Sequence, residues 1–188
     1  MANSIPQQWE VLSKREVFDG RPWLRVFAER LRLPDGREIE GFYGLEMPDY
    51  AVIFATAGDR ILVQRHYKHG PARVGIHLPA GYLEPGEEPL EAARRELREE
   101  TGYVSDTWSL IGTFVNDGNR GAGHAHIFRA RNARQVAAPS SDDLEEGETA
   151  LISPNDLRQA LREGDVPVLS IAAAIALAAL DDGAERAS

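Results

Sequence analysis

Apolar and charged residues alternate along the first part of the chain in a pattern that predicts β-strands. Residues 23–33 alternate in this way, the turn sequence Pro-Asp-Gly follows at 34–36, and residues 37–43 continue the pattern. With a short strand at residues 10–12, this predicts an antiparallel sheet with one solvated face. Because so small a sheet buries little apolar surface, we expect it to pack on the rest of the chain or on a second copy.

A second region begins at about residue 47, where strand patterns alternate with helical ones. Strands are expected at residues 51–55, 60–67, 108–115, 124–130 and 149–152, and helices at residues 89–101, 155–163 and 170–181. The first helix is the best defined, since Pro89 suits its first position and Gly102 suits the left-handed residue after its end. Residues 69–86 are interrupted by glycine and proline, and no helix or strand is assigned to them.

Composition narrows the functional class. The 188 residues include 30 Asp and Glu against 21 Lys and Arg, a formal net charge of −9, so nonspecific binding to nucleic acid or to an anionic membrane is not expected. Cysteine is absent, which excludes disulfides and cysteine nucleophiles and fits a reducing compartment. The first residues lack the pattern of a secretory signal, and the apolar stretch 169–180 is shorter than the roughly 20 residues of a membrane span. We therefore expect a cytoplasmic protein.

Three glutamates gather on one edge of the first predicted helix. With Glu96 at zero on a helical wheel of about 100° per residue, Glu100 lies at about 40° and Glu99 at about −60°. This edge borders the apolar stripe that includes Leu97. Like charges at these spacings repel, and a divalent cation such as Mg2+ or Mn2+, which binds hard oxygen ligands and phosphate oxygens, removes the repulsion. The alternative interpretation is a solvated helix face.

The turn before this helix has features that a purely structural helix does not need. Arg95 can pair with Glu91, four residues away, and can also reach back to Glu87 in the turn. Gly81 and Gly86 allow the backbone to bend sharply and to approach a ligand closely. These features favour the metal-binding interpretation.

The segment from residue 81 to residue 103 resembles the Nudix box. The fixed positions of that motif are matched by Gly81, Glu87, Arg95, Glu96, Leu97, Glu99, Glu100 and Gly102. Only Tyr103 departs, at a position where an aliphatic residue is usual, so the match is specific. The resemblance implies a Nudix hydrolase of the α/β class, an α/β/α sandwich with a mixed sheet. Such enzymes cleave nucleoside diphosphates linked to another moiety.

The resemblance also implies a cofactor and roles for the box residues. It implies Mg2+ or Mn2+, with Glu96 and Glu100 as the principal metal ligands and the backbone carbonyl of Ala80 as another. It makes Glu99 a further ligand or a group that activates water. Metals in such a site neutralise the pyrophosphate, polarise one phosphorus and lower the pKa of the attacking water. A second implied pair, Glu87 with Arg95, orients the loop, and the box also fixes Gly81 and Gly102.

The flanks resemble the ADP-ribose pyrophosphatase and ADP-sugar branch of the family over about residues 8–165. The segments that carry this resemblance are residues 33–37, 63–68 and 78–87. Members of the branch are commonly homodimers in which the amino-terminal sheet helps to form the partner's substrate site. We accordingly expect a homodimer and three parts of the chain. These are an N-terminal β region for dimerisation (1–45), a Nudix hydrolase domain (46–182) and a flexible tail (183–188).

Two departures leave the substrate open. Asn119 stands where ADP-ribose enzymes usually carry a proline, and His77 stands where a glutamate is frequent. The expected reaction is hydrolysis of ADP-ribose or another nucleotide sugar to a nucleoside monophosphate and a sugar phosphate. The alternative is a Nudix-like sensor that binds a nucleotide without cleaving it. His124 and His126 are interpreted as ordinary strand residues rather than as metal ligands.

The remaining candidates lie outside the box. The catalytic base of this branch often lies in a later loop, where Glu145, Glu146 and Glu148 are available. We take Glu146 as the base, with a solvated acidic loop as the alternative. Arg65 and Lys68 are expected to bind the diphosphate, whose charge an otherwise acidic protein must offset.

Overall fold

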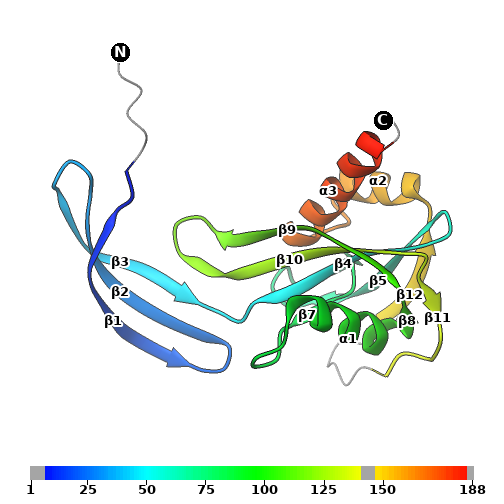
Figure 1. Cartoon of the computed structure of the whole chain (residues 1–188), viewed down its shortest axis with the longest axis horizontal. Helices are drawn as coiled ribbons and strands as arrows, with labels where there is room; N and C mark the ends of the chain where they lie inside the picture. Colours follow the sequence, from blue (N-terminus) through cyan, green and yellow to red (C-terminus); the bar gives the residue numbers. More distant parts are fainter. Residues whose placement is uncertain (1–6, 141–146, 186–188) are drawn as a thin grey trace, which may run out of the picture. The chain divides into compact units, whose positions relative to one another are not determined.

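The computed structural model describes residues 7–140 and 147–185, with side chains to residue 181. The chain forms two compact units. The strands are β1 (Glu10–Gly20), β2 (Leu24–Arg32), β3 (Glu38–Glu46), β4 (Tyr50–Ala57), β5 (Arg60–Lys68), β6 (Arg73–His77), β7 (Ala80–Tyr82), β8 (Tyr103–Val104), β9 (Thr107–Asp117), β10 (Gly121–Arg131), β11 (Arg134–Gln135) and β12 (Gly147–Ile152), and the helices are α1 (Pro89–Thr101), α2 (Pro154–Glu163) and α3 (Leu169–Glu185) (Figure 1).

The N-terminal unit comprises residues 1–48 and 115–124. Its strands β1, β2 and β3 form an antiparallel sheet, as the sequence predicts for residues 23–43. Strand β1 continues to Gly20 instead of ending near residue 12. Most of its side chains are exposed, so it lacks the alternation that marks a half-buried strand, and it is held by main-chain pairing and by cross-strand ion pairs such as Lys14 with Glu46.

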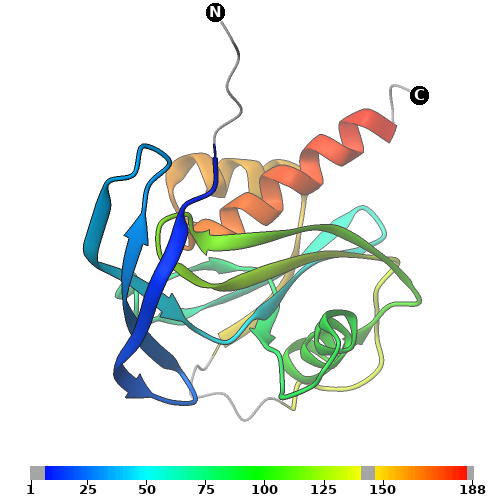
Figure 2. The same ribbon diagram turned by 60° about the vertical axis from the view of Figure 1, so that its left-hand side comes forward.

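The main unit comprises residues 49–114 and 125–188 and is built on a mixed sheet. Strand β10 runs parallel to β4, whereas β5 and β7 run antiparallel to β4, and β6 and β12 run antiparallel to β5. Side chains of β4 alternate between two cores: Ala51 and Ile53 pack with α1, and Val52 and Phe54 pack with α2 and α3. Helices therefore cover both faces of the sheet (Figure 2).

Strands β6 and β7 lie in the segment 69–86, for which the sequence pattern predicts no helix or strand. Both are short, and each forms by pairing with a longer strand, β6 with β5 and β7 with β4. Strand β7 depends on β4, which is distant in sequence, so local pattern does not reveal it, whereas β6 forms a hairpin with the preceding strand β5. The pairing places Gly81 beside Ala51, a fully buried residue of β4.

The helices follow the predicted ends closely. Pro89 lies in the first turn of α1, and Gly102 ends it in the left-handed conformation at φ 73°, both as predicted. Helix α2 is capped by Ser153, the residue before its first turn, whose hydroxyl accepts a hydrogen bond from the main-chain N–H of Asp156 in a capping box. Helix α3 extends to Glu185, four residues beyond the predicted end. Within the described residues, no helix is long and apolar enough to cross a membrane.

Candidate active site

Helix α1 brings two glutamates against the main chain of β7. The Glu96 carboxylate packs directly on Gly81, where a Cβ atom would lie only 2.0 Å from its Cδ atom. One turn later, Oε2 of Glu100 accepts a hydrogen bond of 3.0 Å from the main-chain N–H of Ala80. A side chain at residue 81 would displace Glu96, so the glycine is required by the close approach of helix and strand. Predicted ligand positions on two separate elements thus come together.

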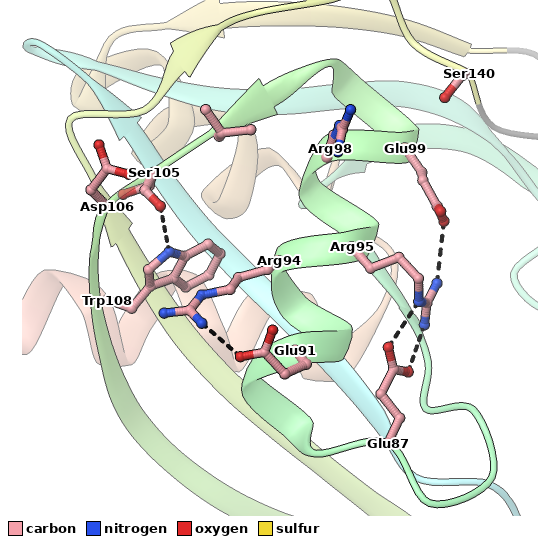
Figure 3. Close-up of a pocket in the computed structure, with 11 residues that line it drawn as sticks. Glu87, Glu91, Arg94, Arg95, Arg98, Glu99, Ser105, Asp106, Trp108 and Ser140 are labelled. Carbon is pink, nitrogen blue, oxygen red and sulfur yellow. Dashed lines mark hydrogen bonds and ion pairs between the residues drawn. The ribbon is translucent and has the colours of Figure 1, made fainter.

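Arg95 joins the turn, the strand end and the helix. Its guanidinium donates two hydrogen bonds of 2.9 Å to the Glu87 carboxylate and one of 3.0 Å to the carbonyl of Tyr82. The Nη1 atom also donates to Glu96 at 2.7 Å. The same atom donates to Glu99 at 3.3 Å, as Figure 3 shows. This charged pairing lowers the pKa of Glu87 and raises the pKa of Arg95. The geometry agrees with the expected pair of Glu87 and Arg95.

The expected pair of Arg95 with Glu91 is wrong. Glu91 instead accepts a hydrogen bond of 2.6 Å from Arg94 on the exposed face of the helix (Figure 3). Arg95 is directed the other way because Glu87 and the Tyr82 carbonyl together offer three acceptors in positions that match its planar guanidinium.

A hollow of about 900 Å³ lies along the outer face of α1 (Figure 3). Arg94, Arg98 and Trp108 line it, and Glu87 and Glu99 are also among its lining residues. Neither of the glutamates that contact β7 lines this hollow. The predicted metal ligands therefore lie on the side of the helix that faces β7, and Glu99 stands between the two regions.

The donor set suits a hard divalent cation. Glu96, Glu99, Glu100 and the main chain of Ala80 carry oxygen atoms that could serve as ligands from α1 and β7. In the described part of the chain, no three acidic or histidine side chains are gathered closely enough to hold an ion as they stand. Here Arg95 satisfies two of these carboxylates and the Ala80 N–H satisfies the third. A bound cation would replace the Arg95 guanidinium as the positively charged partner of the Glu96 and Glu99 carboxylates.

The two basic residues predicted to bind the diphosphate, Arg65 and Lys68, lie on opposite faces of β5. Arg65 is exposed and shares its face with Ile61 and Val63, which pack in the core of α2 and α3. Lys68 shares the other face with Leu62, which packs in the core of α1. Only Lys68 therefore lies on the sheet face that carries the box helix, and alternation along the strand could have revealed this from the sequence.

The predicted base cannot be placed. Glu145 and Glu146 lie outside the described residues. Glu148 is exposed on β12, opposite Arg65 in the register of β12 with β5.

His126, on β10, contacts Oγ1 of Thr113 at 3.0 Å and the Asp49 carboxylate at 3.7 Å.

A buried polar cluster on the α1 face of the sheet was not found from the sequence. It consists of Gln64, His66 and His77, which are at most 8% exposed. The rings of His66 and His77 are stacked, 4.4 Å between centroids and 10° from parallel. Burial lowers the pKa of His77 to about 4, and the nearby His66 and Lys68 charges act in the same direction. The two histidines are eleven residues apart in sequence, so their contact depends on the register of β5 with β6.

This pKa predicts a loss of stability in mild acid. The unfolded chain binds a proton at His77 below about pH 6.5 and the folded chain only near pH 4, so the contribution of neutral His77 is lost as pH falls through this window. Between pH 8 and pH 5 we expect wild-type unfolding free energy to drop by about 2 kcal/mol more than that of His77→Gln. Urea denaturation at the two pH values measures both drops. Equal drops would contradict the expectation.

Comparisons with known proteins agree with this geometry. The family model "NUDIX domain" matches residues 47–170, and "Nucleoside diphosphate sugar hydrolase N-terminal domain" matches residues 9–43. An ADP-ribose pyrophosphatase of Bacillus subtilis (strain 168) is 27% identical over 153 residues, 81% of each chain. Another from Mycobacterium tuberculosis (strain ATCC 25618 / H37Rv) is 28% identical over 185 residues, 93% of this chain and 86% of that protein.

A solved structure confirms the fold. The crystal structure of an ADP compounds hydrolase superposes with a TM-score of 0.81 and 18% identity, over 97% of this chain and 98% of that one. The predicted α/β/α sandwich with a mixed sheet and the predicted hydrolase class are thus confirmed, and hydrolases of this type generally use divalent cations. With the box on α1 and a family model over residues 47–170, the chain belongs to the Nudix family.

Proposed function

We propose that this chain hydrolyses the pyrophosphate bond of ADP-ribose or of another nucleotide sugar, giving a nucleoside monophosphate and a sugar phosphate. The observation that carries the proposal is the meeting of Glu96 and Glu100 with the main chain of β7, in a Nudix box from which only Tyr103 departs. The names of the related proteins and of the matching N-terminal domain support this substrate class.

Each box residue has a role that follows from its contacts. Glu96, Glu100 and the Ala80 carbonyl would hold Mg2+ or Mn2+, with Glu99 as a further ligand or as the group that directs water. The cation would offset the charge of the pyrophosphate and lower the pKa of the attacking water. Arg95 fixes the turn through Glu87, so that the helix and β7 keep their spacing.

The remaining roles are proposals that rest on fewer observations. Lys68 would bind the diphosphate, since it lies on the sheet face of the box helix, whereas Arg65 lies on the opposite face and would need a different approach of the substrate. Glu146 remains our proposed base because it is one of the carboxylates that follow the box in sequence, where the resemblance to this branch of the family implies the base.

We also propose a homodimer, in which the N-terminal β region (1–45) joins two copies of the Nudix domain (46–182). Large apolar side chains of the N-terminal unit are exposed, including Trp9, Phe18, Trp23 and Tyr43. Exposed aromatic residues of this kind are typical of protein interfaces. Light scattering on the purified chain tests this: a mass of one chain at micromolar concentration would contradict the dimer. A cytoplasmic location remains a proposal based on the lack of cysteine.

The test of function is a substrate panel. The protein is incubated with Mg2+ or Mn2+ and, separately, with ADP-ribose, ADP-glucose, GDP-mannose, a dinucleoside polyphosphate and NADH, and phosphate-containing products are counted. We expect a nucleoside monophosphate and a sugar phosphate from ADP-ribose or a nucleotide sugar, with much slower turnover of the others. Repeating the best reaction in 18O-labelled water identifies the phosphorus that is attacked. Turnover of no compound, with tight nucleotide binding, would favour the sensor instead.

A further inference from the structure

The buried cluster of Gln64, His66 and His77 has unsatisfied polar atoms close to the candidate active site. Among the described residues, Oε1 of Gln64 and Nε2 of His77 are buried and have no hydrogen-bond partner. Gln64 and His77 are direct register partners on β5 and β6. Buried polar atoms almost always hydrogen-bond to protein or to ordered water, so unsatisfied atoms on two register partners indicate a site for an ordered water.

The cluster also connects two parts of the proposed site. His66 lies two residues before Lys68 on the same face of β5, and His77 lies three residues before Ala80. Strand β6 ends at His77, and β7, which begins at Ala80, carries Gly81 beside Glu96. The stacked imidazoles thus join β5, which carries Lys68, to the end of β6, three residues before the contact of Ala80 with Glu100.

We propose that Gln64, His66 and His77 form a positioning cluster for the hydrolysis, which holds a bridging water and sets the main chain of Ala80 relative to Lys68. This rests on the proposed function for its reaction. The neutral state of His77 suits the role because an uncharged ring does not repel the neighbouring ammonium of Lys68. An apolar core of similar shape would serve stability equally well, because replacing buried polar atoms by apolar ones is often neutral or stabilising. It would not hold the water.

The test compares His77→Leu with His77→Gln. Glutamine carries an amide in place of the imidazole nitrogen and can still bond to water, whereas leucine cannot. We expect the leucine variant to keep the wild-type KM while its kcat falls about tenfold, the lower range for residues that support metal ligands, and its Tm to fall because Oε1 of Gln64 stays buried without the water. The glutamine variant keeps at least half of the wild-type kcat. Ile76→Val, on the opposite face of β6, is the matched control and keeps full kcat.

A second measurement does not depend on turnover. Hydrogen exchange at the Ala80 amide, measured without substrate, is expected to be about tenfold faster in His77→Leu than in the wild type and the glutamine variant. If the leucine variant does not fold, Gln64→Leu replaces it with the same expectations. Wild-type kcat and exchange in the leucine variant, or equal losses in both His77 variants, would overturn the proposal. A wild type that cleaves no compound would refute the proposed function, and the exchange rates would still decide the positioning role.

Discussion

Replacing Glu100 by glutamine is expected to lower kcat about 1,000-fold while the protein stays folded. The substitution removes a charge that a bound cation needs but keeps an oxygen that can accept the hydrogen bond from Ala80. Loss of about 4 kcal/mol of cation-dependent transition-state stabilisation corresponds to this factor. Glu96→Gln is expected to act in the same way. Initial rates on the best compound of the panel, at saturating Mg2+, measure both effects.

The matched control is Glu91→Gln on the same helix. Glu91 is exposed and pairs with Arg94, away from β7, so its variant is expected to keep the wild-type kcat. A titration with Mg2+ should raise the Tm of the wild type and of this control but not that of Glu100→Gln, because only a protein that binds the cation is stabilised by it. Full activity in both Glu96→Gln and Glu100→Gln would refute the proposed metal ligands.

Substituting Gly81 by alanine is expected to lower kcat about 100-fold without changing any charged residue. The new Cβ atom would lie 2.0 Å from both Cδ and Oε1 of Glu96, so the carboxylate must move. Displacement of a functional group by about 1 Å can cost two orders of magnitude in rate. The variant should also bind Mg2+ more weakly, which isothermal titration calorimetry measures in the absence of substrate.

Gly70→Ala is the control for this variant. A Cβ atom added at Gly70 would meet no heavy atom within 4 Å, and this residue does not have a positive φ, so alanine is accommodated there without movement. The kcat and Mg2+ affinity of this variant should match those of the wild type. If Gly81→Ala also retained both values, the position of the Glu96 carboxylate on β7 would be irrelevant to the reaction.

The sequence predicted those elements whose ends are marked by local chemistry. Helix α1 has a proline in its first turn and a glycine after its last residue, so both ends were found. The strand predicted at residues 10–12 is shorter than β1, because the side chains of β1 are exposed and no alternation marks a strand of this kind. Strands β6 and β7 were missed because their stability comes from pairing with β5 and β4 rather than from their own residues.

In the candidate site, too, some contacts could be predicted from the sequence and others could not. The carboxylates of Glu96, Glu99 and Glu100 could be predicted because helical spacing relates residues close in sequence. The partners of Arg95 could be predicted only in part, since the choice between Glu87 and Glu91 depends on the path of the turn. Contacts between strands, such as the stack of His66 on His77, depend on register and could not be derived from one sequence.

The pairing of β7 with β4 has a consequence for how this enzyme can change over evolution. The residues of β4 that pair with Ala80 and Gly81 are fully buried, so we expect this part of the site to open only when the central sheet unfolds. A core substitution in β4 should therefore reduce turnover and folding stability in parallel. New substrate specificities must arise in other segments, whose sequence can vary without loss of stability in the central sheet.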